Sequence, residues 1–321
     1  MNWGIVGLGK IAHAFVKDLQ LVEGAYILSA ASRDHDRARE FAQIYDIENA
    51  YGSYAELFQD PNVDVVYIGT PHDSHAALSI EASKSGKHVL CEKPLAVNAQ
   101  QVTQMIEAAD KNGVFLMEAL WSRFNPSIMA IFDRIRAGEI GEVNYINVDF
   151  TFLRNDPVDH RLLRMDLAGG SLLDMGIYPV FLTYLLMGVP DQISALGRMH
   201  PNGADQQTAA IFKYSNGIAN VMSGFQSQSE MCARIYGTRG SILIDPVWHE
   251  TSGFTIVKGE SREHFTIPPR GKGFTHEIEE TMECIANGKL QSDQWSHKDS
   301  LNLIRILDEI RRQIDLKYPF E

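Results

Sequence analysis

Cysteine is scarce in this chain of 321 residues. Its three cysteines, Cys91, Cys232 and Cys284, are widely spaced, and none belongs to a Cys-x-x-Cys pair or to a cluster with histidine. This spacing excludes a disulfide framework and a zinc site of the zinc-finger type, so we expect no metal. Unpaired cysteines also fit a reducing compartment, and we expect a soluble, cytoplasmic protein.

Positive charge is also in short supply. The 29 Lys and Arg residues are outnumbered by 41 Asp and Glu residues, which gives a formal net charge of −12. Phosphate backbones and anionic membrane surfaces repel such a chain, so we expect neither nucleic acid nor a membrane as a partner. No apolar stretch of about 18 residues and no secretory signal is found. A local basic pocket for one phosphate remains compatible with this balance.

The first part of the chain alternates short β-rich segments with helical patterns. We expect strands at 3–8, 25–31, 63–69, 88–91 and 114–117, and helices at 11–21, 36–45, 74–85 and 99–112. Asp34, Ser74 and Asn98 are the expected N-caps. This alternation predicts an α/β fold with a parallel sheet covered by helices on both faces, a doubly wound Rossmann domain over residues 1–119.

The pattern changes near residue 120. A helix at 126–137 precedes longer strands at 143–152, 192–199, 208–214, 218–225, 231–236 and 241–244, with further helices at 171–187, 275–286 and 297–314. Close turns such as Ser215-Asn216-Gly217 predict hairpins, so residues 120–321 should form an α+β domain on an open, mostly antiparallel sheet. Apolar residues on both faces of 208–225 predict a homodimer or higher homo-oligomer assembled through that sheet.

A glycine motif follows the first predicted strand and opens a helix. It consists of Gly7, Leu8, Gly9, Lys10, Ile11 and Ala12. The first glycine permits a tight turn, the second lets the backbone approach a diphosphate, and the small alanine lets helix and strand pack closely. In this context the motif predicts that a nicotinamide dinucleotide binds at the positive end of the helix.

The end of the second strand should decide between the two nicotinamide coenzymes. An acidic residue there would accept hydrogen bonds from a ribose hydroxyl and favour NAD. The chain has Ser32-Arg33-Asp34 instead. A hydroxyl and a planar cation suit a 2′-phosphate, so we favour NADP(H) and keep NAD(H) as the alternative. Arg33 as a solvated loop residue is the structural alternative.

Three further motifs follow in order. They are Thr70-Pro71-His72-Asp73-Ser74-His75, then Cys91-Glu92-Lys93-Pro94-Leu95, then Gly169-Gly170-Ser171-Leu172-Leu173-Asp174-Met175-Gly176-Ile177-Tyr178. Together with the glycine motif they resemble the Gfo/Idh/MocA family of oxidoreductases over essentially the whole chain. The Glu-Lys-Pro step and the Asp-x-Gly-x-Tyr segment are the most specific parts of this resemblance.

The resemblance implies a Rossmann domain followed by an α+β domain with an open antiparallel sheet. It further implies that Lys93 is the catalytic lysine and that the Lys93–Pro94 bond is cis. Many members carry histidine where this chain has Tyr178. With tyrosine at this position, the chain resembles the branch that contains glucose-fructose oxidoreductase, dimeric dihydrodiol dehydrogenase and D-xylose 1-dehydrogenase. Ala168 departs from a glycine common in relatives, and we expect it to be tolerated.

Tyr178 and Asp174 are spaced four residues apart, so on a helix they share one face. Cationic neighbours, Lys93 and an oxidised nicotinamide, would favour the phenolate of Tyr178. Tyr178 can then exchange a proton with a substrate hydroxyl while hydride is transferred at the same carbon. Asp174 could orient the substrate or Lys93. A packing role for Tyr178 and a helix-end role for Asp174 are the structural alternatives.

Several residues are predicted to contact the coenzyme near these motifs. Besides the glycine motif, they are Ser32, Arg33, Thr70, Pro71, His72, His75, Glu92, Lys93 and Arg123. Either histidine could instead be a loop residue, and their His-x-x-His spacing has no third metal ligand. Trp121 and Asn125 flank Arg123 where family members line the cleft. Between residues 152 and 166, Arg154, His160, Arg161 and Arg164 belong either to a loop over the pocket or to a solvated basic turn.

These patterns predict an NADP(H)-dependent oxidoreductase that acts on a hydroxyl or carbonyl of a sugar, cyclic polyol or diol. An NAD-dependent inositol- or amino-sugar-type dehydrogenase is the alternative among enzymes. A non-catalytic dinucleotide- or sugar-sensing regulator of the same fold is the alternative outside them. Lys93, Asp174 and Tyr178 together favour an enzyme, because a pure binding protein has no chemical need for all three.

Overall fold

The computed structural model describes residues 1–154 and 160–321. These residues divide into two compact units, residues 1–121 with 270–301 and residues 122–269 with 302–321. The sequence analysis assigned all residues after 119 to the second domain, whereas the segment 270–301 packs with the first unit. The chain first passes from the first unit to the second between residues 121 and 122, two residues after the expected boundary between 119 and 120.

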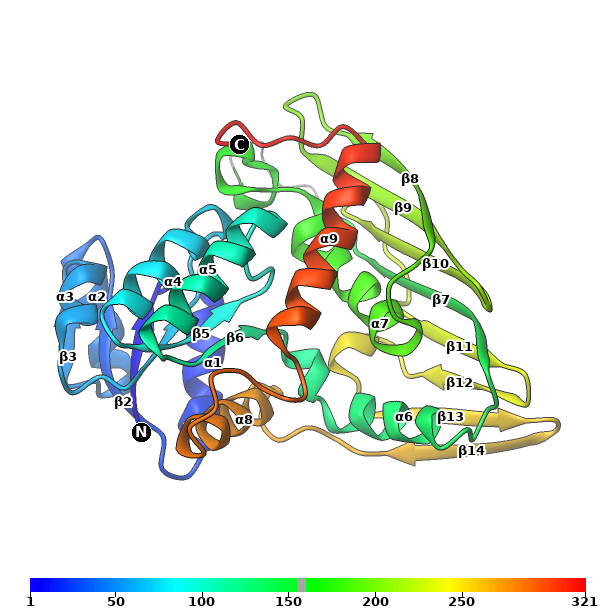
Figure 1. Ribbon diagram of the computed structural model, residues 1–321, viewed down its shortest axis with the longest axis horizontal. Coiled ribbons are helices and arrows are strands. Elements are labelled where there is room, and N and C mark those ends of the chain that lie inside the picture. Colours follow the sequence, from blue (N-terminus) through cyan, green and yellow to red (C-terminus); the bar gives the residue numbers. More distant parts are fainter. Residues whose placement is uncertain (155–159) are drawn as a thin grey trace. The chain divides into compact units, whose positions relative to one another are not determined.

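The first unit is built on a parallel sheet in the order β3-β2-β1-β4-β5-β6. Its strands are β1 (Asn2–Val6), β2 (Tyr26–Ala31), β3 (Asn49–Tyr51), β4 (Val65–Ile68), β5 (His88–Glu92) and β6 (Leu116–Ala119). Its helices are α1 (Lys10–Leu19), α2 (His35–Tyr45), α3 (Tyr54–Gln59), α4 (His75–Lys84), α5 (Ala99–Asn112) and α8 (Thr275–Ala286). The expected Rossmann-type fold is confirmed (Figure 1), although β3 and α3 were not predicted.

The strand order reverses direction between β1 and β4. Because crossovers between parallel strands are right-handed, helices before and after this reversal cover opposite faces of the sheet. The strands β1 and β4 stay paired to their carboxyl ends, and the chain leaves the two ends toward opposite faces of the sheet, which is where open α/β sheets form the crevice that binds ligands. The glycine motif follows β1, and Thr70 follows β4.

Local capping explains where most of these helices begin. Asp34 accepts hydrogen bonds from the backbone amides of Asp36 and Arg37, and Asn98 accepts one from Gln101, as predicted. Ser74 occupies the predicted N-cap position of α4, but its side chain makes no capping hydrogen bond. A short 3-10 turn, His72–Ser74, leads directly into α4, and the Ser74 hydroxyl donates to Thr70 Oγ1 (2.9 Å) and to the Pro71 carbonyl (2.8 Å).

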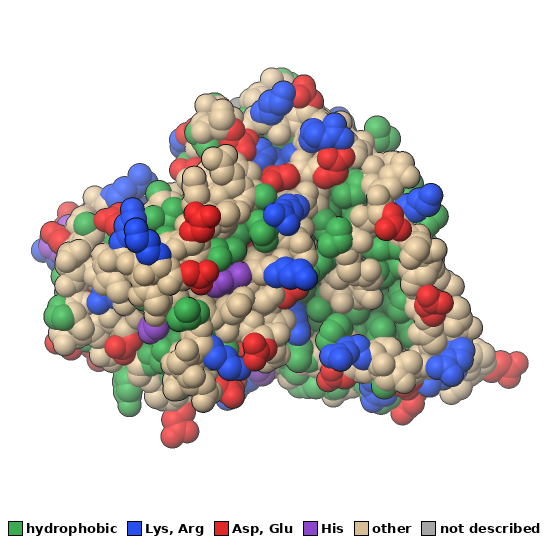
Figure 2. Space-filling view, in the orientation of Figure 1, with side chains coloured by type: hydrophobic (Ala, Val, Ile, Leu, Met, Phe, Trp, Pro, Cys, Tyr) green, Lys and Arg blue, Asp and Glu red, His purple; other side chains and the backbone are tan. Residues whose placement is uncertain are grey.

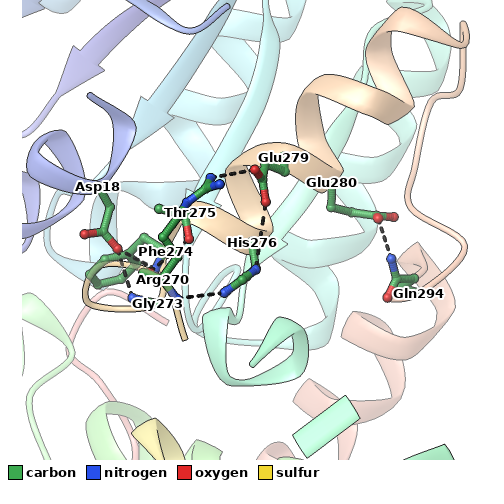
Figure 3. A network of polar contacts seen from close by, with 9 residues as sticks. All are labelled: Asp18, Arg270, Gly273, Phe274, Thr275, His276, Glu279, Glu280 and Gln294. Carbon is green, nitrogen blue, oxygen red and sulfur yellow. Dashed lines mark hydrogen bonds and ion pairs between the residues drawn. The ribbon is translucent and has the colours of Figure 1, made fainter. Parts of the chain in front are cut away.

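Asp18 attaches the late segment 270–301 to the first unit (Figure 3). Its buried carboxylate accepts hydrogen bonds from the amides of Lys272 (2.9 Å), Gly273 (2.9 Å) and Phe274 (2.8 Å), just before α8 begins. An acidic side chain at a helix N-terminus satisfies amides that have no partner within the helix. These hydrogen bonds join positions more than 250 residues apart, so no local sequence pattern predicts them.

In the second unit, the described strands form one mixed sheet in the order β14-β13-β12-β11-β7-β10-β9-β8. They are β7 (Val143–Thr151), β8 (Gln192–Met199), β9 (Asp205–Tyr214), β10 (Gly217–Gly224), β11 (Ala233–Gly237), β12 (Gly240–Ile244), β13 (Gly253–Lys258) and β14 (Ser261–Thr266). All pairs are antiparallel except β7 with β10, so the mostly antiparallel sheet is confirmed. The last two strands were not predicted.

Helices cover one face of this sheet. They are α6 (Pro126–Arg136), α7 (Ile177–Met187) and the later part of α9 (His297–Gln313), which begins in the first unit (Figure 1).

One helical stretch of the described residues, Met165–Met187, is long and apolar enough to cross a membrane by length and composition alone. The sequence analysis overlooked it because Asp166 and Asp174 interrupt it. Of its most apolar window, 72% is buried, as in a core helix.

Candidate functional site

The glycine loop leaves the first turn of α1 without a side-chain cap. Gly9 is the N-cap residue, and apart from Gly9 and its two chain neighbours no atom of the described residues lies within 4 Å of where its Cβ would be. Gly7 has φ of +87°, and a Cβ there would lie 2.7 Å from the Thr70 amide nitrogen. The loop thus combines uncapped amides with open space beside Gly9, the arrangement that accepts a diphosphate. These features fit the expected dinucleotide.

The segment after β2 carries the residues predicted to select the coenzyme. Ser32 is buried and its hydroxyl oxygen accepts a hydrogen bond from the Asp34 amide at 3.2 Å, while Arg33 is exposed. Arg37, in the first turn of α2, donates to the Leu8 carbonyl of the glycine loop at 3.4 Å. Sequence analysis missed Arg37, although its position one turn after Arg33 was a usable signal.

The loop after β4 is tied to the loop after β5. His75 is fully buried, and its Nδ1 and Nε2 lie 2.9 Å from the carbonyl oxygens of Pro94 and Thr70, respectively. His72 is also buried, with its ring centroid 5.6 Å from that of His75. The two hydrogen bonds described for His75 therefore go to backbone carbonyls. Coenzyme contacts for Thr70, Pro71, His72 and His75 stay predictions.

Lys93 follows β5 at the carboxyl edge of the sheet. The Lys93–Pro94 bond is cis, as the resemblance implied. Glu92 is buried and accepts a hydrogen bond from the Tyr67 hydroxyl at 2.6 Å. Burial, and then the neighbouring Glu92 carboxylate, raise the pKa of Tyr67. The hydrogen bond from Tyr67 thus fixes the side chain of Glu92, the residue before Lys93. The predicted coenzyme contact of Glu92 remains a prediction.

Tyr178 and Asp174 lie in the second unit, at the start of α7. The expected helix 171–187 begins as a π-helical turn, Leu172–Gly176, and only then becomes α-helical. π-Helical turns occur frequently at functional sites. Asp174 forms an ion pair with Arg161 at 3.1 Å. Arg161 therefore belongs with the predicted site residues of this unit.

Aromatic rings surround Tyr178, which is only 6% exposed. Its ring centroid lies 5.5 Å from Phe150 and 5.2 Å from His249, and His249 stacks on Phe150 at 4.2 Å. Sequence analysis missed His249, because nothing around Trp248-His249 distinguishes it from an ordinary loop. It supplies a second titratable side chain beside the phenol.

Asp205 fixes the segment that precedes Tyr178. Its Oδ2 accepts hydrogen bonds from the Ser171 hydroxyl (2.7 Å), the Leu172 amide (2.8 Å) and the Thr208 hydroxyl (2.8 Å). Burial raises the pKa of Asp205 to about 6, although these hydrogen bonds oppose the shift. Gly170, with φ of +134°, leaves room for Asp205, because a Cβ there would collide with its Oδ1.

Ala168, which stands where glycine is common in relatives, has a strained backbone conformation. Its φ is +57°, in the left-handed region that favours glycine. Ala168 is fully buried, and its amide donates to the Met165 carbonyl at 3.2 Å. This contact ends the 3-10 turn Met165–Leu167 and turns the chain toward Gly169. The surrounding hydrogen bonds hold the strained conformation.

Arg123, Trp121 and Asn125 have structural contacts in the described chain. The buried Arg123 guanidinium lies 5.4 Å from the Phe132 ring centroid and contacts the Met129 sulfur. Trp121 stacks on Phe274 at 4.9 Å. Asn125 caps α6. The predicted coenzyme contact of Arg123 is not among these contacts and stays a prediction.

The predicted basic loop at 152–166 is only partly described, since residues 155–159 lie outside the described residues. In its described part, Arg164 pairs with Asp166, and the His160 ring accepts a hydrogen bond from the Leu162 amide at 3.3 Å. Among the described residues, no group of three or more His, Cys, Asp and Glu side chains could hold a metal. On the face shown in Figure 2, Lys and Arg are interspersed with Asp and Glu.

A model of an oxidoreductase family with an NAD-binding Rossmann fold, GFO_IDH_MocA, matches residues 1–120. A second model, for the GFO/IDH/MocA C-terminal domain, matches residues 128–243. The chain belongs to the Gfo/Idh/MocA family. It is therefore an NAD(P)-binding oxidoreductase, as its sequence predicted.

Named relatives of this Gfo/Idh/MocA chain are enzymes. Trans-1,2-dihydrobenzene-1,2-diol dehydrogenase from Bos taurus is 36% identical over 99% of this chain and 98% of its own length. A 3-ketoreductase from Actinomadura kijaniata in complex with NADP and TDP-benzene is 25% identical, with a TM-score of 0.89 and 98% of each chain covered. Aldose-aldose oxidoreductase from Caulobacter crescentus, complexed with glycerol, is 25% identical, with a TM-score of 0.89 over 98% of this chain and 97% of that one.

Proposed function

We propose that this Gfo/Idh/MocA oxidoreductase uses NADP(H) to interconvert a hydroxyl and a carbonyl of a sugar, cyclic polyol or diol. The observation that carries the proposal is Lys93, at the carboxyl edge of the sheet that also presents the glycine loop. A lysine at that edge can contact both coenzyme and substrate. The diol named for the Bos taurus relative and the aldose named for the Caulobacter crescentus neighbour support this substrate class.

The dinucleotide, when bound, supplies or accepts the hydride. The uncapped first turn of α1, Gly9 included, would hold its diphosphate. Ser32, Arg33 and Arg37 would hold the 2′-phosphate, because two guanidinium groups and a hydroxyl follow one strand end. The bond from Arg37 to Leu8 supports its inclusion, since it brings that cation to the glycine loop.

Three side chains of this chain serve the chemical step in our proposal. Lys93 donates to the substrate oxygen and to the nicotinamide ribose. Tyr178 takes the proton from a substrate hydroxyl in oxidation and returns it in reduction. Asp174 orients the substrate, and its ion pair with Arg161 holds the carboxylate in place. The aromatic neighbours Phe150 and His249 support this role for Tyr178, because they fix its ring.

We also propose that the protein is a homodimer or larger homo-oligomer joined through the open face of the second sheet. Leu196, Ile211 and Ile218 are 81%, 52% and 48% exposed. Strand register places them on the same face, together with Tyr145. A contiguous exposed apolar patch usually marks an interface. Three free cysteines support the cytoplasm as its compartment.

A substrate panel tests the proposed function. Sugars, polyols and diols, trans-1,2-dihydrobenzene-1,2-diol among them, are each offered with NADP⁺ and with NAD⁺, and the absorbance of the reduced nicotinamide is followed. We expect turnover of at least one member, faster with NADP⁺, and its loss in Lys93→Met. Tight dinucleotide binding without turnover of any member, in either direction, would favour a sensing regulator instead.

A further inference from the structure

Glu118 is a buried carboxyl group next to the Lys93 loop. It lies on β6, the edge strand, where the register pairs it with Cys91 of β5, and it is 3% exposed. Its Oε1 accepts a hydrogen bond from the Leu95 amide at 2.9 Å, and its Oε2 accepts one from the Trp295 indole at 3.1 Å. The Ser300 hydroxyl also bonds this carboxylate. Such burial is costly for a carboxylate unless its oxygens are bonded.

The backbone after Lys93 is held on two sides by buried side chains of the first unit. The Pro94 carbonyl lies 2.9 Å from Nδ1 of His75, and the Leu95 amide donates to Glu118. The two residues that follow Lys93 are therefore both fixed through their backbone groups. A side chain gains catalytic precision when its supporting shell is fixed in this way.

The contacts of Glu118 with Leu95 and Trp295 favour a carboxylate over an amide. Both of its oxygens face N–H groups, the Leu95 amide and the Trp295 indole, and neither group can accept a hydrogen bond. Burial raises the pKa of Glu118, and the hydrogen bonds from Ser300, Trp295 and Leu95, followed by the charge of Lys93, oppose this rise only in part. The loop and its anchor are thus coupled by hydrogen bonding through the Leu95 amide.

We propose that Glu118 is a positioning residue for the reaction and holds the Lys93 loop in its working geometry through the Leu95 amide. The proposal rests on the proposed function, in which Lys93 is catalytic. Glu118 acts only through Lys93, with Trp295 fixing the carboxylate from the other side. His75 fixes the Pro94 carbonyl of the same loop.

Glu118→Gln is the first test. It keeps the size of the side chain but forces an NH₂ group against an N–H donor. We expect kcat to fall by about 10²-fold, the scale of a small misplacement of a catalytic group. The dissociation constant for NADPH should stay unchanged. Trp295→Phe alone keeps the bond to Leu95 and should cost much less.

The double variant Glu118→Gln/Trp295→Phe should regain most of the lost turnover. The amide NH₂ then faces a phenyl ring, and the amide oxygen can accept from Leu95. Because Glu118 and Trp295 are in contact, their effects on stability need not add, so a merely structural role could restore the melting temperature, whereas a positioning role predicts recovery of kcat at unchanged melting temperatures. Absence of rescue, with melting temperatures close to the wild type, would overturn the proposal.

The Lys93→Met background separates this inference from the proposed function. With Lys93 removed, Glu118→Gln should leave the residual single-turnover rate unchanged, since groups that act as one unit are not additive. An equal loss in both backgrounds, or normal kcat in Glu118→Gln, would overturn the positioning role alone. Normal turnover in Lys93→Met would overturn the proposed function and this inference together.

Discussion

Arg33 and Ser32 directly follow β2, and coenzyme preference depends on them in our account. Arg33→Ala should weaken NADP(H) binding by about 1.5–3 kcal/mol, the range for a hydrogen bond to a charged group, and should leave NAD(H) binding nearly unchanged. Isothermal titration with both coenzymes measures this. Arg39→Ala is the matched control, because Arg39 is exposed and pairs with Asp36. Equal wild-type affinity for the two coenzymes would contradict the assignment.

Asp205 gives the second unit a pH-dependent stability. Its folded-state pKa is raised to about 6, so the folded protein holds a proton more tightly than the unfolded chain. Its contribution to the unfolding free energy must then fall as pH rises from about 4 to about 6. Denaturant titrations at both pH values should show wild type losing stability relative to Asp205→Asn. A pH-independent difference between the two proteins would disprove the shift.

Local motifs predicted part of the site, and tertiary contacts supplied the rest. The glycine loop and Asp34 were readable because short-range geometry demands those residue types, whereas the cis Lys93–Pro94 bond was implied by the family resemblance. Glu118 and His249 were not, because a glutamate on a strand and a histidine in a loop carry no local signal. Their roles come from partners such as Trp295 and Tyr178, far away in the chain.

At the scale of elements, substitutions in the turn between β1 and α1 distinguish effects on fold stability from effects on coenzyme binding. Gly9→Ala should leave the melting temperature close to the wild type, since nothing described surrounds its Cβ position. It should weaken NADP(H) binding at least about tenfold, or about 1.4 kcal/mol, by obstructing the diphosphate. Gly7→Ala is the contrast and should destabilise the fold by about 1–3 kcal/mol. Unaltered coenzyme affinity in Gly9→Ala would show that the dinucleotide binds elsewhere.

Alternation of strands and helices was sufficient to predict the parallel sheet. It missed β3 and α3 because three- and six-residue elements are too short to show a period. β14 was missed because its side chains are largely exposed and polar, without the alternation of a half-buried strand. The π-helical turn before α7 was also unreadable: a Cβ at Gly176 would lie 2.8 Å from Ser223 Oγ, and no local pattern shows that Ser223 is so near.

At the scale of the whole molecule, assembly is the feature open to a direct test. Light scattering at micromolar concentration should give at least twice the monomer mass. Leu196→Asp with Ile211→Asp should yield monomers, because two charges would be buried at the interface. Leu21→Asp, which changes a leucine of the first unit that is about as exposed as Ile211, should leave the assembly intact. A monomeric wild-type protein would contradict the proposed assembly through the open face of the second sheet.

The division of the chain is a second feature at this scale. Residues 270–301 belong to the first unit because Asp18 caps the start of α8 and Glu118 bonds Trp295. A single boundary along the sequence cannot include a segment that returns to the first unit after 148 residues of the second, 122–269. The expected division at residues 119 and 120 therefore described the first crossing of the chain and missed the second.

The most direct measurement of the central claim is the turnover of Tyr178→Phe on the best substrate of the panel. This change deletes only the hydroxyl, so packing against Phe150 and His249 should survive. If Tyr178 transfers the proton, kcat should fall about 10²–10⁴-fold with NADP(H) affinity unchanged. Tyr184→Phe, on the same helix, should remain active. Near-normal turnover in Tyr178→Phe would contradict the account and leave the tyrosine as a packing residue.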